Sequence, residues 1–284
     1  MPEVESLARF LRERCVGRTI AGVDLAAFSA LKTYDPPLAA LQGLEIDGVE
    51  RRGKFLDLSA QGLHLVFHLA RAGWLRWRDE LPVAPPRPGK GPLALRLRLD
   101  DGSGFDLTEA GTQRKLAVHV VADPSSIEMV ATLGPEPLSS TFDQAVLDAL
   151  LAKAGRAQLK GVLKDQRVIA GIGNAYSDEI LHVAKMSPFK PATSLTSEER
   201  ASLLAAIKGE LTGAIQRAEG LAAKDLKGEK KSGMRVHGKA GQPCPVCGDT
   251  VAEVSFADSS LQYCPTCQTG GKKLADRRMS RLLR

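Results

Sequence analysis

Four of the five cysteines in this 284-residue chain lie in two CxxC pairs near its end. A hairpin between the pairs would bring the four thiolates together into the tetrahedral sulfur site that Zn²⁺ prefers. Four protein ligands leave no open position for water, so we expect one structural Zn²⁺ and no organic cofactor. A redox role for the two pairs is the weaker alternative. The expected ligands are Cys244, Cys247, Cys264 and Cys267.

A second motif, GIGN, lies within the stretch DQRVIAGIGNAYSDEIL and ends at Asn174. We expect Gly171 and Gly173 to end one helix and NAYSDEIL to begin another. Backbone N–H groups exposed at such a turn form a natural phosphate site, and the Asn174 amide adds a neutral donor. Taken alone, the same glycines also fit a simple tight connection between helices.

Composition and charge limit the class of protein. With 43% hydrophobic and 25% charged residues, the chain has the composition of a globular protein. It contains no run of about twenty apolar residues and no signal pattern, so we expect a cytoplasmic protein without a membrane partner. Paired cysteines in that reducing compartment favour metal over disulfides. The net charge is +6, and basic runs flank the cysteines, which favours a polyanionic partner over a merely solvated surface.

The spacing of apolar residues predicts the elements that must position these motifs. An amphipathic helix should occupy the N-terminus and stop at Gly17. Alternating segments from Thr19 to about Val121, with a DDGSG hairpin turn, predict a β-sandwich or barrel. A proline-containing linker follows. Helices should then start near residues 141, 158, 175 and 197, the last with Ser197 as its N-cap.

The predicted fold class is therefore α+β and multidomain. It combines an N-terminal β-sandwich carrying an N-terminal helix, a helix–two-turn–helix domain and a C-terminal four-cysteine zinc finger. Nothing in the sequence suggests an oligomer interface, so we expect a monomer. The predicted segments are 1–123 (sandwich), 124–140 (linker), 141–233 (helical domain) and 234–284 (zinc finger with a basic tail).

These residues resemble the formamidopyrimidine-DNA glycosylase/endonuclease VIII family. IAGIGNAYSDEIL is similar to its helix–two-turn–helix signature, and VHGKAGQPCPVCG with YCPTCQ to its zinc finger. RRGKFL, HLARAGWL and LGPEPL match its N-terminal domain and linker in the same order. The resemblance covers essentially the whole chain.

The resemblance implies that the opening MPEVE carries the chemistry. Removal of Met1 would expose the secondary amine of Pro2, which would attack the sugar C1′, expel the base and leave an iminium. Glu3 would move a proton to the sugar or to the base. Without the resemblance, Pro and Glu are simply favoured in the first turn of a helix. The family usually begins MPELPEVE, so either a shortened terminus places Pro2 and Glu3 in these roles or the printed chain starts late.

The resemblance also implies contacts to DNA phosphates. Lys54, in RRGKFL, would contact the phosphate beside the lesion and act as the third catalytic residue. His68 and Asn174 match two further phosphate contacts, which together would help to hold a nucleotide rotated out of the stack. The alternatives from the residues alone are an exposed strand lysine for Lys54 and a core histidine for His68.

Three departures from the family pattern affect how DNA would be read. Arg71 replaces the methionine that fills the gap left by the flipped base, and TEAGTQRKL, containing Arg114, replaces the DPRRFG loop. Ser259 replaces the arginine before the third cysteine, which removes a charged phosphate contact. Gln262, Arg235 or the basic tail are the candidate substitutes.

We therefore expect a DNA repair glycosylase with abasic-site lyase activity. It would excise oxidised bases from double-stranded DNA through a Schiff base on Pro2, and would associate with the nucleoid when on DNA. The alternative is a catalytically weakened or inactive protein that binds damaged DNA or abasic sites, which the departures favour. A zinc-ribbon protein of transcription or translation would leave MPEVE, RRGK and the GIGN turn unexplained.

Overall fold

The computed structural model describes residues 1–86, 89, 91–111, 113–257 and 259–275. The chain packs into two compact units. The N-terminal unit comprises Pro2–Thr132 and Ala218–Lys227, and the helical unit comprises Leu133–Arg217 and the chain from Gly228 onward, together with Met1. The four segment boundaries predicted from the sequence stay predictions.

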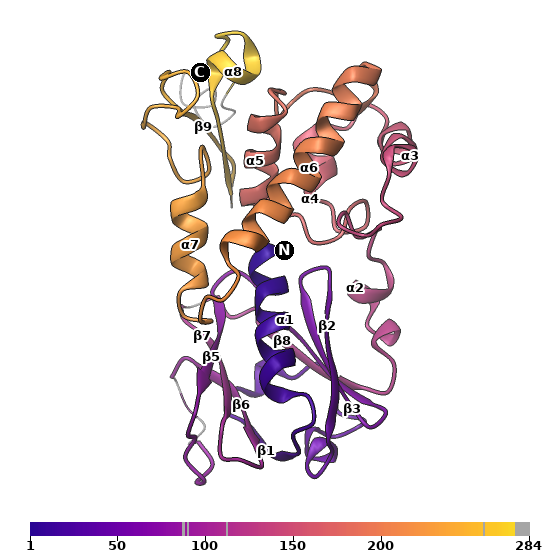
Figure 1. Cartoon of the computed structure of the whole chain (residues 1–284), viewed down its shortest axis with the longest axis vertical. Helices are drawn as coiled ribbons and strands as arrows, with labels where there is room; N and C mark the ends of the chain where they lie inside the picture. Colours follow the sequence, from indigo (N-terminus) through magenta and orange to yellow (C-terminus); the bar gives the residue numbers. More distant parts are fainter. Residues whose placement is uncertain (87–88, 90, 112, 258, 276–284) are drawn as a thin grey trace. The chain divides into compact units, whose positions relative to one another are not determined.

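Two antiparallel four-stranded sheets form the N-terminal unit, in the orders β1-β6-β7-β5 and β2-β3-β4-β8 (Figure 1). On β6, Leu95, Leu97 and Leu99 face the core and Arg96 and Arg98 face outward, which is the alternation of a half-buried strand. The predicted β-sandwich is confirmed. The strands are β1 (Ile20–Leu25), β2 (Ile46–Arg52), β3 (Phe55–Ala60), β4 (Leu63–His68), β5 (Gly73–Arg78), β6 (Leu93–Leu99), β7 (Gly104–Glu109) and β8 (Ala117–Val121).

Helix α1 (Pro2–Cys15) packs on β2 and β3 of this sandwich. Its buried stripe of Leu7, Leu11 and Cys15 follows the predicted helical spacing. The Arg12 guanidinium donates two hydrogen bonds, of 3.0 and 2.6 Å, to the carbonyl oxygen of Val49 on β2. The helix is thus fixed in position along its length as well as by its apolar face.

Short elements fill the connections of the N-terminal unit. Two 3₁₀ helices, η1 (Phe28–Ala30) and η2 (Leu38–Leu41), lie between β1 and β2. The predicted linker contains another, η3 (Pro124–Ser126), and the short helix α2 (Glu128–Ala131).

Five helices and the 3₁₀ helix η4 (Ala192–Ser194) follow in sequence. Four of the helices, α3 to α6, start within three residues of the predicted positions, whereas α7 was not predicted. The N-cap of α6 was predicted wrongly, because Thr196 and not Ser197 takes that role. Glu199 N–H donates to Thr196 Oγ1 at 3.3 Å, and Thr196 N–H donates to Glu199 Oε2 at 3.0 Å, forming a capping box. The helices are α3 (Gln144–Ala154), α4 (Leu159–Lys164), α5 (Asn174–Val183), α6 (Ser197–Arg217) and α7 (Leu226–Gly233).

The zinc-finger segment forms a hairpin of β9 (Ala252–Ser255) and β10 (Ser260–Tyr263), followed by α8 (Pro265–Thr269). Its described residues form two small apolar clusters: one of Val236, Val251 and three of the cysteines, the other around Val254, Leu261 and Tyr263. Within the described part of the chain, no helix is long and apolar enough to cross a membrane.

Candidate active site and nucleic-acid interface

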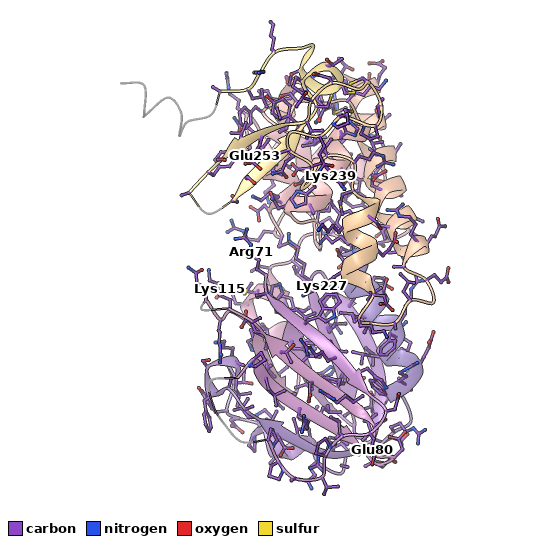
Figure 2. The ribbon with its side chains drawn as sticks, turned by 90° about the vertical axis from the view of Figure 1, so that its left-hand side faces the viewer. Arg71, Glu80, Lys115, Lys227, Lys239 and Glu253 are labelled. Carbon is purple, nitrogen blue, oxygen red and sulfur yellow. The ribbon has the colours of Figure 1, made fainter. Side chains whose placement is uncertain are left out.

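Strand register brings several predicted site residues to one end of the sandwich. Lys54 lies in the turn between β2 and β3, where Arg52 pairs with Phe55. His68, the last residue of β4, pairs with Phe55, and its ring lies 4.8 Å from the Phe55 ring. Arg71 is exposed in the loop that follows. It lies at the same end of the sandwich as Lys115, with Glu80 at the opposite end (Figure 2).

The first turn of α1 is held at this same end by a pair of residues that the sequence did not single out. Arg51, at the end of β2, binds the Glu5 carboxylate at 2.8 Å and the Gly53 carbonyl oxygen at 2.9 Å. Burial pushes the pKa of Glu5 upward, but the bonds from Arg51 and Arg9 outweigh it and leave the pKa lowered. The ionised Glu5 therefore ties the start of α1, with the buried Pro2 and Glu3, to the turn that carries Lys54.

The environment of His68 makes it a neutral hydrogen-bond donor. Burial, and then the nearby charge of Lys54, lower its pKa to about 4. Ala70 N–H donates to His68 Nδ1 at 3.0 Å, so the proton of the neutral ring is on Nε2. An Nε2–H group can donate to a phosphate oxygen across the neutral pH range.

The loop that departs from the family pattern is closed by its own carboxylate. Glu109, only 3% exposed at the end of β7, accepts bonds of 2.9 Å from the N–H groups of both Lys115 and Leu116. Arg114 donates to the Gly91 carbonyl oxygen at 3.0 Å. Thr112 lies outside the described residues. Glu109 is another residue that the sequence did not single out, and it gives the loop a defined path.

In the helical unit, the two turns between α4 and α5 are braced by Gln166. Its Oε1 accepts from Gly171 N–H at 2.9 Å, and its Nε2 donates to the Ile172 carbonyl oxygen at 2.7 Å. Gly171, at φ 84°, has the left-handed conformation that favours glycine. Because the Gly171 N–H group already donates to Gln166, it is not one of the exposed donors expected from the sequence. The first N–H groups of α5 have no partner inside the helix, and Gly173 supplies no side-chain cap.

Asn174, the first residue of α5, contacts the zinc-finger hairpin. Its Nδ2 donates to the carbonyl oxygen of Ser260 on β10 at 2.8 Å, and its Oδ1 is buried. One amide proton of the predicted phosphate contact is thus already used to join α5 to the hairpin.

Two buried carboxylates on α5 anchor the chain that enters the zinc finger. Glu179 accepts three bonds of 2.8 to 2.9 Å, from the N–H groups of Arg235, Val236 and His237. Burial raises the pKa of Glu179 in spite of these donors. Asp178, which is fully buried, accepts from His237 Nδ1 at 2.8 Å and forms an ion pair with the Lys160 ammonium.

The candidate substitutes for the missing arginine have other partners. Gln262 is 3% exposed, and its amide binds Glu253 at 2.6 Å and Gly238 N–H at 3.2 Å, which directs it into the finger. The Arg235 guanidinium lies 2.7 Å from the Glu210 carboxylate on α6 and 3.9 Å from that of Glu179. The backbone carbonyl oxygen of Ser259 accepts from Phe256 N–H at 2.7 Å in the β9–β10 turn, a bond that does not involve the serine side chain. The basic tail from residue 276 lies outside the described residues.

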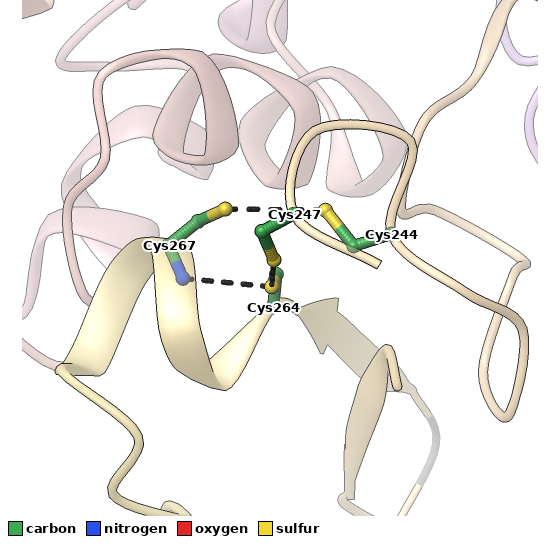
Figure 3. Close-up of side chains that lie close together, drawn as sticks. All are labelled: Cys244, Cys247, Cys264 and Cys267. Carbon is green, nitrogen blue, oxygen red and sulfur yellow. Dashed lines mark hydrogen bonds between the residues drawn. The ribbon is translucent and has the colours of Figure 1, made fainter. Parts of the chain in front are cut away.

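The four cysteines of the two CxxC pairs come together, with Cys244 and Cys247 from a loop and Cys264 and Cys267 from the start of α8 (Figure 3). Their sulfur atoms all lie within 4.8 Å of one another, with 3.9 Å between Cys244 and Cys267 and 3.3 Å between Cys247 and Cys264. A tetrahedral Zn²⁺ site with bonds of about 2.3 Å needs sulfurs about 3.8 Å apart. The four residues therefore fit one structural Zn²⁺, as the sequence indicated.

A β-sandwich, a braced two-turn connection between helices and a four-cysteine finger define a zinc-finger protein of the DNA-repair glycosylase type. Three family models match: the formamidopyrimidine-DNA glycosylase N-terminal domain over residues 1–117, its H2TH domain over 133–225, and a zinc finger found in FPG and IleRS over 241–270. The chain belongs to the formamidopyrimidine-DNA glycosylase family. The family expected from the sequence is confirmed.

Individual relatives agree. The formamidopyrimidine-DNA glycosylase of Symbiobacterium thermophilum is 35% identical over 279 residues, covering 94% of this chain and 88% of that protein. An uncharacterized formamidopyrimidine-DNA glycosylase-like protein of Mycobacterium tuberculosis is 60% identical over 152 residues, covering 54% of this chain and 94% of that protein. Among solved structures, the Lactococcus lactis enzyme bound non-covalently to DNA containing an AP site has a TM-score of 0.81 at 26% identity, covering 95% and 99% of the two chains. The MutM protein of Thermus thermophilus has a TM-score of 0.79 at 32% identity, covering 96% and 99%.

Proposed function

We propose that the chain is a monomeric, bifunctional DNA glycosylase and abasic-site lyase acting on double-stranded DNA with damaged bases or abasic sites. The observation that carries this proposal is the gathering of Pro2, Glu3, Lys54 and His68 at one end of the N-terminal unit. Their placement rests on the strand register and on the Glu5–Arg51 ion pair. The similar Lactococcus lactis structures hold DNA with an abasic site or with a damaged guanine.

The proposed reaction begins when Met1 is removed, because the Pro2 nitrogen is otherwise an amide. The freed secondary amine attacks C1′, the C1′–N bond breaks, and the base leaves with a proton supplied through Glu3. The amine nitrogen then gives up its proton and the C1′–O4′ bond breaks as O4′ takes a proton through Glu3, which leaves an iminium at C1′. The iminium lets a base remove a C2′ proton, and the bond from C3′ to the 3′ phosphate breaks so that the phosphate leaves. Water then hydrolyses the iminium, releases the sugar and restores the amine. A bound Zn²⁺ would hold the finger rigid and take no part in these steps.

Phosphate contacts would hold the nucleotide in place. The Lys54 ammonium supplies positive charge, and the His68 Nε2–H group supplies a neutral donor. The first N–H groups of α5 offer a further phosphate site. Arg71, exposed at the tip of its loop, would occupy the gap left by the rotated base, and Arg114 and Arg235 stay candidate DNA contacts.

A damaged-DNA-binding protein with weak or no catalysis is the second candidate. The observation that favours it is the loop from Thr108 to Leu116, which Glu109 closes onto its own backbone. Ser259 points the same way, because a serine in place of the family's arginine supplies no charged phosphate contact. Such a protein would bind abasic sites without cutting them.

Borohydride trapping on duplex DNA containing an abasic site separates the two candidates. The protein should first be shown by intact mass to lack Met1. We expect a covalent band that weakens in Pro2→Gly, which has a primary amine, and disappears when the N-terminus is extended by a short Gly-Ser peptide. Cys15→Ser is the matched control, because burial raises the pKa of that thiol to about 12 and leaves it unreactive.

A band that survives the extension would place the nucleophile elsewhere in the chain and overturn the assignment of Pro2. Failure to form a band, together with intact binding of the abasic duplex, would establish the binding protein instead.

A further inference from the structure

His182, near the end of α5, lies against a zinc-ligand cysteine but belongs to no motif singled out above. Its side chain is buried, and its Nε2 atom lies 3.3 Å from Cys244 Sγ. The residue comes from the helical elements and not from the zinc-finger segment, so this contact links the two parts of the unit. Cys244 lies in the first of the two pairs that approach each other in Figure 3.

The chemistry of the sulfur determines which atom donates. A cysteine that binds Zn²⁺ is a thiolate, which has no proton and can only accept hydrogen bonds. His182 Nε2 must therefore carry a proton and donate it to Cys244 Sγ. Nδ1 of the same ring is buried and has no hydrogen-bond partner in the described part of the chain. A proton on Nε2 pairs that atom with the thiolate and leaves Nδ1 only as an unpaired acceptor, whereas a proton on Nδ1 would bury an unsatisfied donor and leave Nε2 with nothing to donate to sulfur.

Two ordinary roles for a buried histidine do not account for this arrangement. A histidine in the last turn of a helix often binds the final carbonyl groups through its ring. Here the ring points to sulfur, and the bond that closes the helix is donated by Ala184 N–H to the Ile180 carbonyl oxygen. A side chain that only fills space would not need a nitrogen at hydrogen-bond distance from the zinc-ligand cysteine Cys244. A phenylalanine ring would fill a similar volume and would bury no unpaired nitrogen.

The contact completes a row of attachments along α5. Asn174 binds the hairpin at the start of the helix, Asp178 and Glu179 bind the entering chain in its middle, and His182 reaches the cysteines near its end. The spacing of 178 and 182 places these side chains on one face of the helix. The contact between His182 and Cys244 is therefore the third of three attachments between the finger and α5, the helix that follows the predicted phosphate-binding turn.

We propose that His182 is a positioning residue of the zinc site, which donates its Nε2–H group to the Cys244 thiolate and so fixes the metal-bound finger to α5. Hydrogen bonds to a thiolate reduce its charge and hold its orientation, and outer partners of this kind typically change metal affinity by about 10- to 100-fold. The inference concerns zinc retention and holds whether or not the proposed excision chemistry occurs.

The first test uses the unaltered, zinc-loaded full chain and asks for the tautomer. Nitrogen-15 NMR of histidine-labelled protein should show the His182 ring neutral, with its proton on Nε2. Replacing zinc by cadmium-113 should reveal scalar coupling between that proton and the metal through sulfur. A proton on Nδ1 would overturn the proposal without any variant having to fold.

The second test measures zinc release to a coloured chelator in the absence of DNA. We expect His182→Phe to release zinc about 10- to 100-fold faster than the unaltered chain. His182→Gln, whose amide can donate from a similar position, should recover most of the difference. His119→Phe, a half-buried histidine change on β8, is the matched control and should leave release unchanged.

Substituting cobalt(II) for zinc gives an absorption spectrum that a loss of stability alone would not change. Removal of a hydrogen bond from a thiolate shifts its charge-transfer band to cobalt, so His182→Phe should shift that band and His182→Gln should restore it. Unchanged release together with an unchanged band in His182→Phe would reduce His182 to a packing residue and overturn the proposal.

Discussion

The N-terminal unit and the zinc-finger segment of the helical unit hold their functional residues by different means. In the N-terminal unit an apolar core runs between two sheets, and the predicted active residues lie at the end of strands that this core already fixes. The part of the zinc finger that the structure describes has two small apolar clusters, and its position depends on buried carboxylates, amides and cysteines. A large core spreads the free energy of unfolding over many contacts, whereas a small module concentrates it in a few specific bonds. Single changes should therefore be most damaging in the finger.

The largest expected effect is that of metal removal. Structural zinc contributes about 10 to 16 kcal/mol to the folding of such modules. Chelation, or Cys264→Ser, should abolish hydrogen-exchange protection of residues 241–270 while the sandwich strands keep theirs. Cys15→Ser should keep its zinc, because that thiol lies in the core of the N-terminal unit. Persistent protection of the metal-free finger would show that its apolar clusters suffice, and the comparison would fail.

Loss of the Glu179 carboxylate should rank second. Glu179→Ala would leave three buried N–H groups, those of residues 235–237, without their acceptor. We expect it to lower the free energy of unfolding by about 3 to 5 kcal/mol, measured by urea denaturation. Glu179→Gln retains one acceptor oxygen and should cost less. Glu198→Gln, an exposed glutamate in the first turn of α6, should stay within about 0.5 kcal/mol of the unaltered chain.

These differences also explain how much the sequence could predict. Helix starts, alternating strands and the CxxC pairs depend on local spacing, so they were visible in the sequence. The burial of Asp178 and Glu179 was not, because a charged pair on a helix ordinarily faces solvent, and their partners in the chain that enters the zinc finger lie more than fifty positions away. The misplaced cap of α6 had a local signal, since Thr196 and Glu199 have the spacing of a capping box.

For the site residues, too, the sequence indicates which residues are involved, and only the fold shows which contacts position them. Pro2, Glu3, Lys54 and His68 came from family motifs, but the bonds that position them could not be inferred from those motifs. Arg51 and Glu5 lie far apart in sequence and meet only because α1 packs beside β2.

A third prediction concerns pH and the N-terminal unit. The folded pKa of His68 is about 4, below its ordinary value of about 6.5. Between these values the unfolded chain binds a proton that the folded chain does not, so the contribution to stability is present above pH 6.5 and is lost as pH falls toward 4. Stability should therefore fall by up to about 2 kcal/mol between pH 7 and 5 on account of this residue. Comparing urea unfolding at the two pH values should show a smaller drop in His68→Gln, and an equal drop would contradict the assignment.

The smallest effect on stability should be that of Arg51, although its effect on activity should be larger. Arg51→Met removes the nearer of the two arginine partners of Glu5 and the bond to Gly53, which together orient the Lys54 turn against the start of α1. We expect a loss of about 1 kcal/mol in the free energy of unfolding. Borohydride trapping should nevertheless slow by about tenfold or more, because reacting groups tolerate little displacement.

Arg9 provides the matched control for this last change, since it pairs with the same Glu5 at 3.3 Å but is 48% exposed. Arg9→Met should leave both stability and trapping nearly unchanged, as an exposed ion pair contributes little. If the two variants slow trapping equally, the charge of Glu5 would matter and not the orientation of the turn. If neither variant slows trapping, the sandwich core alone fixes the position of the predicted active residues. The N-terminal unit would then depend even less on single polar bonds than its contrast with the zinc finger implies.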